Sequence, residues 1–146
     1  MPAASYYLIF SVAAFRVAVP VSAVRRGTQA VAVQPLPDVA DDVVGGIVVA
    51  GRPVPVLDLR ARFGMPLRAL RLEDPFVIVA DGDLEVALWV DAVESVEPLA
   101  ISGAGTPADS RVHCDDDGLL VVLDVARYFR PEMREALQRT LAALSA

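Results

Sequence analysis

The residue types that could do metal or thiol chemistry gather at one point of the chain, where His113 and Cys114 precede the aspartates at 115–117. Because successive side chains of a strand point to opposite faces, His113 and Cys114 would not converge on one ion. The aspartate run also lacks the alternating ligand spacing of a calcium loop. A Cys114 nucleophile would need a base beside it, and a neighbour on the opposite face is a poor one. We therefore predict a solvated turn here, without a metal or a cofactor.

Other catalytic patterns are missing from the sequence. It contains no Asp-Thr-Gly or Asp-Ser-Gly motif, no glycine-rich phosphate loop after a strand and no Gly-x-Ser-x-Gly elbow. Trp89 is more typical of a core or an interface than of a ligand platform, although an exposed tryptophan on a sheet would be a binding hot spot. The sequence therefore predicts a protein that is not an enzyme.

The amino-acid composition further limits the class of protein. The chain has 146 residues, 55% of them apolar, which is enough to bury a core in one domain. Thirteen arginines, no lysine and nineteen acids give a net charge of −6, so a nucleic-acid surface is not expected. The single cysteine excludes an intramolecular disulfide and fits a reducing compartment.

The apolar start of the chain raises the question of export. Residues 6–15 are largely apolar, and Val21-Ser22-Ala23 resembles a small-residue cleavage site. A signal peptide carries positive charge before its apolar stretch, whereas here Arg16 follows it. No run reaches the roughly eighteen apolar residues that a spanning helix requires. We expect a cytoplasmic protein with no membrane span, and keep an exported β-protein as an alternative.

Alternating and β-branched runs predict a series of short strands. A first antiparallel pair is expected before residue 22, and Asp81-Gly82-Asp83 and the aspartates at 115–117 with Gly118 are hairpin turns. The expected strands are Tyr6–Val12, Phe15–Val21, Gln29–Gln34, Phe76–Ala80, Leu84–Val96 and Leu119–Leu123.

The stretch 43–62 has the densest signals. Gly51-Arg52 is predicted to turn a hairpin, because glycine reaches positive φ without steric cost. Pro53 and Pro55 lie on one side of the following strand and lack N–H donors, which predicts an edge strand. Leu59 and Phe63, four residues apart, predict a helical turn.

One amphipathic helix closes the chain. Pro131 begins it, and its apolar face is expected to carry Met133, Leu137, Leu141 and Leu144. Many short strands and one substantial helix predict an all-β fold, with either one or two small barrels.

Several of these motifs together resemble the CheW domain, the coupling adaptor of bacterial chemosensory arrays. Val-Gly-Gly-Ile at 44–47, Val-Pro-Val-Leu-Asp-Leu-Arg at 54–60 and Phe63-Gly64 are similar to the family's central stretch. The exit of the second strand at 17–24, the Val90-Asp91 strand end and the closing strand into a helix at 119–129 also resemble it.

The resemblance implies two small SH3-like five-stranded β-barrels packed on a shared hydrophobic seam. It places a CheW-like domain at residues 5–130 and a C-terminal helix at 131–146. It also implies non-enzymatic scaffold work that couples the tip of a methyl-accepting chemoreceptor to a CheA-type histidine kinase, at receptor arrays beneath the inner membrane. Other CheW-like proteins are further expected partners.

Two departures bear on the expected partner surface. The arginine that the family usually carries at the hairpin is Ala50 here, and an acidic residue before the third strand is Arg26. The partner-binding residues that we predict from motif and resemblance are Val24, Arg25, Arg26, Ala50, Gly51, Arg52, Val54, Val56, Trp89 and Val93. The alternative function is a sensor domain on the same barrels that binds a small molecule in the seam.

Overall fold

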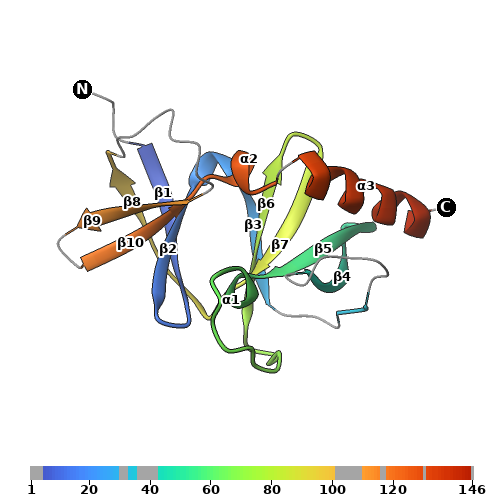
Figure 1. Cartoon of the computed structure of the whole chain (residues 1–146), viewed down its shortest axis with the longest axis horizontal. Helices are drawn as coiled ribbons and strands as arrows, with labels where there is room; N and C mark the ends of the chain where they lie inside the picture. Colours follow the sequence, from blue (N-terminus) through green and yellow to red (C-terminus); the bar gives the residue numbers. More distant parts are fainter. Residues whose placement is uncertain are drawn as a thin grey trace.

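The computed structural model of the chain describes residues 5–29, 33–35, 43–100, 110–115, 118–129 and 131–145. Their strands form two five-stranded sheets side by side, with a helix at the outer end of one sheet (Figure 1). The first sheet has the order β8-β1-β2-β10-β9 and consists of β1 (Ser5–Val12), β2 (Phe15–Pro20), β8 (Ala92–Leu99), β9 (Ser110–Asp115) and β10 (Gly118–Leu123). The second sheet has the order β3-β6-β7-β5-β4 and consists of β3 (Val24–Gln29), β4 (Val43–Val49), β5 (Arg52–Asp58), β6 (Pro75–Asp81) and β7 (Leu84–Trp89). The helices are η1 (Val21–Ala23), α1 (Leu59–Arg62), α2 (Val125–Tyr128) and α3 (Pro131–Ser145).

Both halves of the sequence contribute to the first sheet. β1 and β2 form an antiparallel hairpin, and β10, from the other end of the chain, lies parallel to β2, with Val121 opposite Val17. The strands between, β3 to β7, form the second sheet. The chain crosses from the first sheet to the second at η1 and back between β7 and β8. Each sheet therefore depends on pairings between residues far apart in sequence.

Because successive side chains of a strand point to opposite faces, the buried apolar side chains form three separate clusters. In β6, Val77 and Val79 face the region between the sheets, whereas Phe76 and Ile78 face a cluster within the second sheet. The largest cluster, which we call the seam, combines side chains from both sheets with residues of α2 and α3; it includes Phe10, Val12, Val17, Val19, Val77, Val79, Val86, Leu88, Leu123, Tyr128, Phe129 and Leu137. Each fully buried side chain of this kind contributes about 2 kcal/mol by leaving water, so the seam is a principal source of stability.

Several sequence-based predictions are confirmed. The chain is all-β with two five-stranded sheets and a shared seam, while closure of each sheet into a barrel stays a prediction. The hairpins at 81–84 and 115–118 are present, as is the early strand pair. α1 begins after Asp58, whose carboxylate caps it by accepting a hydrogen bond from the Arg60 backbone N–H. At the β4–β5 hairpin the turn is Ala50-Gly51, both with positive φ, so it lies one residue earlier than predicted.

The prediction that Pro53 and Pro55 mark an edge strand is wrong. β5 is internal, because it pairs antiparallel with β4 and parallel with β7. The β7 ladder begins only at Val56, so both prolines lie outside it and remove no donor from it. The edge of this side of the sheet is β4.

Two strand boundaries also differ from prediction. β3 is Val24–Gln29, so it begins before the strand predicted at Gln29–Gln34. Residues 30–32 of that prediction lie outside the described residues, and Gln34 forms an isolated bridge with Gly46, closed by hydrogen bonds of 2.9 and 2.7 Å. A Cβ on Gly45 would lie 2.3 Å from the Gln34 carbonyl oxygen, which explains a glycine at this crossing. The predicted strand 84–96 is two strands that belong to different sheets, and they separate at Asp91.

The C-terminal helix packs against the second sheet. Leu137 is 3% exposed within the seam and Leu141 packs against it. Arg134 pairs with the Asp81 side chain at the end of β6. Met133 and Leu144, which the sequence places on the same helix face, have side chains outside the described set.

Candidate functional site

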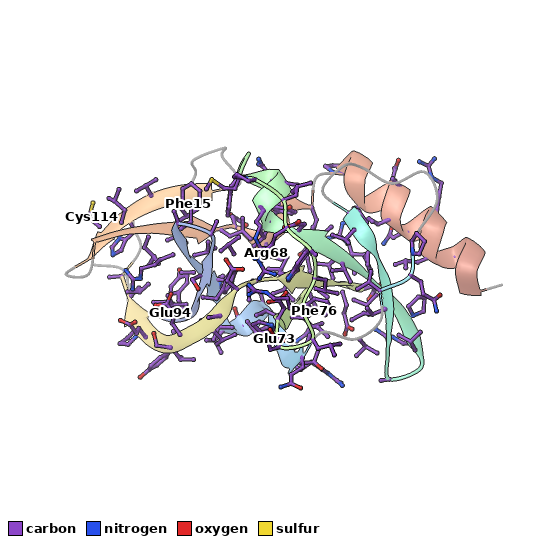
Figure 2. All side chains as sticks on the ribbon, turned by 90° about the horizontal axis from the view of Figure 1, so that it is seen from below. Phe15, Arg68, Glu73, Phe76, Glu94 and Cys114 are labelled. Atoms are coloured by element: carbon purple, nitrogen blue, oxygen red, sulfur yellow. The ribbon has the colours of Figure 1, made fainter. Side chains whose placement is uncertain are left out.

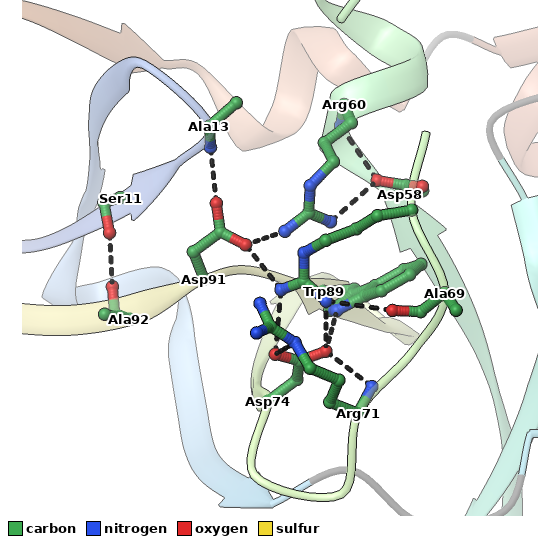
Figure 3. A network of polar contacts seen from close by, with 11 residues as sticks. Ser11, Ala13, Asp58, Arg60, Ala69, Arg71, Asp74, Trp89, Asp91 and Ala92 are labelled. Atoms are coloured by element: carbon green, nitrogen blue, oxygen red, sulfur yellow. Dashed lines mark hydrogen bonds and ion pairs between the residues drawn. The ribbon is translucent and has the colours of Figure 1, made fainter. Parts of the chain in front are cut away.

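A charged network occupies the junction between the sheets. Its members come from the end of β5, from α1, from the loop before β6 and from the crossing between β7 and β8 (Figure 3). They are Asp58, Arg60, Arg68, Asp74, Trp89 and Asp91, and we call them the junction network.

Arg60 is the buried cation of this network, with 2% of its surface exposed. One terminal nitrogen lies 3.4 Å from the Asp58 carboxylate, and the other pairs with the Asp91 carboxylate. Its guanidinium carbon lies 4.8 Å from the centre of the Trp89 ring. Burial lowers the pKa of Arg60, and the nearby Arg68 lowers it further, but a guanidinium stays protonated across the physiological range. The fold therefore holds a permanent charge beside its core.

Arg68 contacts two of the three carboxylates of the junction network, Asp74 and Asp91. Its two terminal nitrogens each lie 2.8 Å from an oxygen of Asp74, and one also lies 2.6 Å from Asp91. Asp74 is 2% exposed and also accepts hydrogen bonds from Trp89 Nε1 and the Arg71 backbone. These hydrogen bonds, that of Arg68 foremost, hold the pKa of Asp74 well below its usual range. This ionised, bidentate pair between Arg68 and Asp74 holds the loop before β6 in place.

Asp91 carries the network across to the first sheet. Its second carboxylate oxygen accepts a 2.5 Å hydrogen bond from the Ala13 backbone N–H, in the β1–β2 turn. Its own backbone N–H donates to the Ser11 carbonyl oxygen over 2.8 Å. Ala13 has a φ of 52°, a conformation that L-residues rarely adopt, and the carboxylate supports it there. Asp91 thus joins the turn of one sheet to the arginines of the other (Figure 3).

Neither a metal site nor a membrane-spanning helix is found in the part of the chain that the structure describes. Among the described residues, no group of three or more His, Cys, Asp and Glu side chains is placed to hold a metal ion. His113 pairs in register with the buried Leu120, while Cys114 is exposed and pairs with the exposed Leu119, so the two adjacent side chains face opposite ways. No described helix has the length and apolar character required to cross a membrane.

The seam is filled by packed side chains. A cavity of about 300 Å³ lies where the two hairpin ends of the second sheet meet α3; Arg52, Asp83, Glu85, Gln138 and Leu141 line it. It borders the seam through Leu141, and binding of a small molecule stays an alternative prediction.

The predicted partner residues divide by exposure. Val54, Val56 and Trp89 are at most 3% exposed and belong to the core of the second sheet, so any effect on a partner would be indirect. Val24 is half-buried, and the exposed ones are Arg25, Arg26, Ala50, Gly51, Arg52 and Val93. The first five of these exposed residues lie on β3 and on the β4–β5 hairpin, whereas Val93 lies on β8 of the other sheet. Partner contact by these residues stays a prediction.

An exposed apolar surface continues from the seam along β1 and β8, and we call it the β1–β8 strip. Val93 of β8 lies opposite the buried Phe10, and Val96 lies opposite Leu8. Val93, Val96 and Tyr6 are 47%, 55% and 62% exposed. A bulge at this point of the pairing shifts the register, so the residues 93 and 96, three apart, share one face.

The sequence indicates some of these residues and not others. Asp58 and Arg60 belong to the central motif and Trp89 is a predicted contact, but the junction network is not predicted. Nothing local relates Arg68, Asp74 and Asp91 to one another, because they meet only through the fold. Within the strip, Val93 is a predicted contact. The sequence does not relate Val96 to Val93, because the bulge breaks the two-residue period, and it does not relate Tyr6 to them, because Tyr6 lies on another strand.

Comparison with known proteins identifies the family. The family model for the CheW-like domain matches residues 6–132. The fold is similar to the crystal structure of the scaffolding protein TtCheW from Thermoanaerobacter tengcongensis, with a TM-score of 0.70 and 23% identity over 84% of this chain and 89% of that one. No curated protein matches the sequence.

Proposed function

The chain belongs to the CheW-like domain family, and from this premise we propose that it is a non-enzymatic adaptor that couples chemoreceptors to a CheA-type histidine kinase. The role places it in the cytoplasm, at receptor arrays beneath the inner membrane. Its output is chemotaxis, pilus function or surface motility. The proposed work requires stable binding surfaces and no catalytic residues.

The observation that carries the proposal is the β1–β8 strip. It presents apolar side chains of β8 opposite Phe10 and Leu8 of β1, which belong to the seam or pack against it, so the surface continues directly from the core. An amphipathic helix buries its apolar face in this kind of surface. The helical tip of a receptor is therefore the partner that we assign to the strip. Each contact is expected to be weak alone and to gain strength from the many copies in an array.

Substitutions on the strip test receptor binding. We expect Val93→Asp and Val96→Asp each to weaken binding of a receptor cytoplasmic fragment by about tenfold or more, because a charge would be buried against apolar partner atoms. Leu72→Asp is the matched control, since Leu72 is 81% exposed and lies in the loop before β6, away from the strip. Calorimetry with the purified full chain measures all three. Equal affinity for the strip variants and the control would contradict the assignment.

The kinase contact is assigned to the exposed residues of β3 and the β4–β5 hairpin. Arg26 is exposed on β3, so an acidic group of the partner can reach it. Arg26→Glu is expected to weaken binding of the kinase's adaptor-like domain, and the loss should shrink as salt is raised. An acid-to-arginine change on the partner should restore affinity. Unchanged affinity at low salt would remove Arg26 from the interface.

A further inference from the structure

The two sheets leave four edge strands among the described residues, and three of them carry features that oppose pairing with another strand. β8 contains a bulge and Pro98. β3 contains a bulge beside adjacent arginines, and β4 contains a bulge and is bridged at Gly46 by Gln34. Bulges, prolines, edge charges and covering segments are the devices by which proteins block edge pairing.

The fourth edge, β9, differs from these three in its regularity. It pairs with β10 from Asp115 to Ser110 without a register shift, and the strand contains no proline. Its outer face carries exposed apolar side chains: Val112 is 67% exposed, and Leu119, which lies opposite Cys114 on β10, is 66% exposed. Cys114 is also exposed on this face and lies at the end of the first sheet that is remote from α3 (Figure 2). A regular edge strand that presents apolar side chains is a template for another strand.

The register also determines which backbone groups are free. Asp115 and Gly118 are partners across a two-residue turn, and such turns close with a hydrogen-bonded pair. Hydrogen-bonded and non-hydrogen-bonded pairs alternate along an antiparallel ladder. Residue 113 therefore bonds to β10, while the N–H and C=O groups of Val112 and Cys114 point away from the sheet.

We propose that β9 pairs antiparallel with β9 of a second copy of this chain, about a twofold axis at His113. In this register Val112 lies opposite Cys114 of the other copy, and both pairs use the free backbone groups. The sequence places arginine at 111 and aspartate at 115, which become opposite neighbours across the axis, a favourable pairing of charges. A strand with this order of charges is complementary to itself, as a twofold interface requires. The inference is independent of the kinase and receptor contacts.

A charge exchange at two exposed positions tests the pairing. In V112K/C114K every lysine would face a lysine of the other copy, and we expect the dimer to weaken by about tenfold or more. In V112K/C114E each lysine would face a glutamate, so the dimer should be retained. Sedimentation of the full chain over a concentration series measures both, and circular dichroism checks that each variant is folded. A wild-type chain that stays monomeric at the highest measurable concentration, or variants that dimerise equally, would overturn the proposal.

A crosslink tests the register. Residues 113 of the two copies would form a directly opposed, non-hydrogen-bonded pair with Cα atoms about 4.5 Å apart, within reach of a disulfide. The variant H113C/C114S should therefore form a covalent dimer on mild oxidation. In L119C/C114S the cysteines would lie three strand spacings apart, about 14 Å, and should not join. Crosslinking of the second variant and not the first would overturn the proposed axis.

Discussion

Asp91→Asn should destabilise the protein through the junction network. Removing one partner of a buried ion pair costs about 3–5 kcal/mol. Asp91 itself is 27% exposed at its side chain, and Arg60 keeps Asp58, so we expect a smaller loss of about 2 kcal/mol in the free energy of unfolding. The asparagine retains an oxygen that can accept the Ala13 hydrogen bond.

Asp91→Ala separates the two functions of the carboxylate. It also removes the acceptor for Ala13, a charge-assisted hydrogen bond worth about 1.5 kcal/mol, so its loss should reach about 3.5 kcal/mol. Exchange of the Ala13 amide hydrogen should accelerate in this variant more than in Asp91→Asn.

Urea unfolding at neutral pH and low salt provides the measurement. Glu94→Gln is the matched control, because Glu94 is close to Asp91 in sequence, and its 3.9 Å pair with Arg16 is partly exposed. That change should cost at most about 0.5 kcal/mol. If Asp91→Asn were no more destabilising than Glu94→Gln, the network would not hold the sheets, and the reasoning would be refuted.

Three further predictions concern local features. Gly45→Ala should lower the free energy of unfolding in urea by about 1–3 kcal/mol, because its Cβ would lie 2.3 Å from a backbone oxygen. Gly27→Ala is the control and should be nearly neutral, since its Cβ would lie 3.9 Å from the nearest atom; equal effects would count against the close approach of Gly45 to Gln34. Ala50→Asn should raise the free energy of unfolding, measured in urea, by about 0.5–1 kcal/mol, since asparagine tolerates the φ of 52°, while Ala14→Asn should not. Because the pKa of Asp74 is lowered on folding, the stability it contributes is complete above its ordinary value of 3.8 and should be lost as pH falls below it; Asp74→Asn should show a shallower acid dependence between about pH 4 and 2.

Local features that the sequence determines are those set by a few neighbouring residues. Glycine permits the positive φ of the turns at Gly82 and Gly118, and alternating apolar residues specify strands whatever their partners. The helical turn after Asp58 follows from its cap and from residues four apart. The family resemblance rests on the same local motifs, so it too follows from the sequence alone.

Only the tertiary structure decided which strands are neighbours. Proline at 53 and 55 suggested an edge by a local rule, yet β7 begins to pair with β5 only beyond them, so the rule did not apply. Residues 84–96 look continuous in sequence, but a strand is divided when its two halves bury their side chains in different sheets. Arg60, Arg68 and Asp91 show the same limit: a charge is tolerated near the core when partners from distant segments reach it, and only the folded chain brings those partners together.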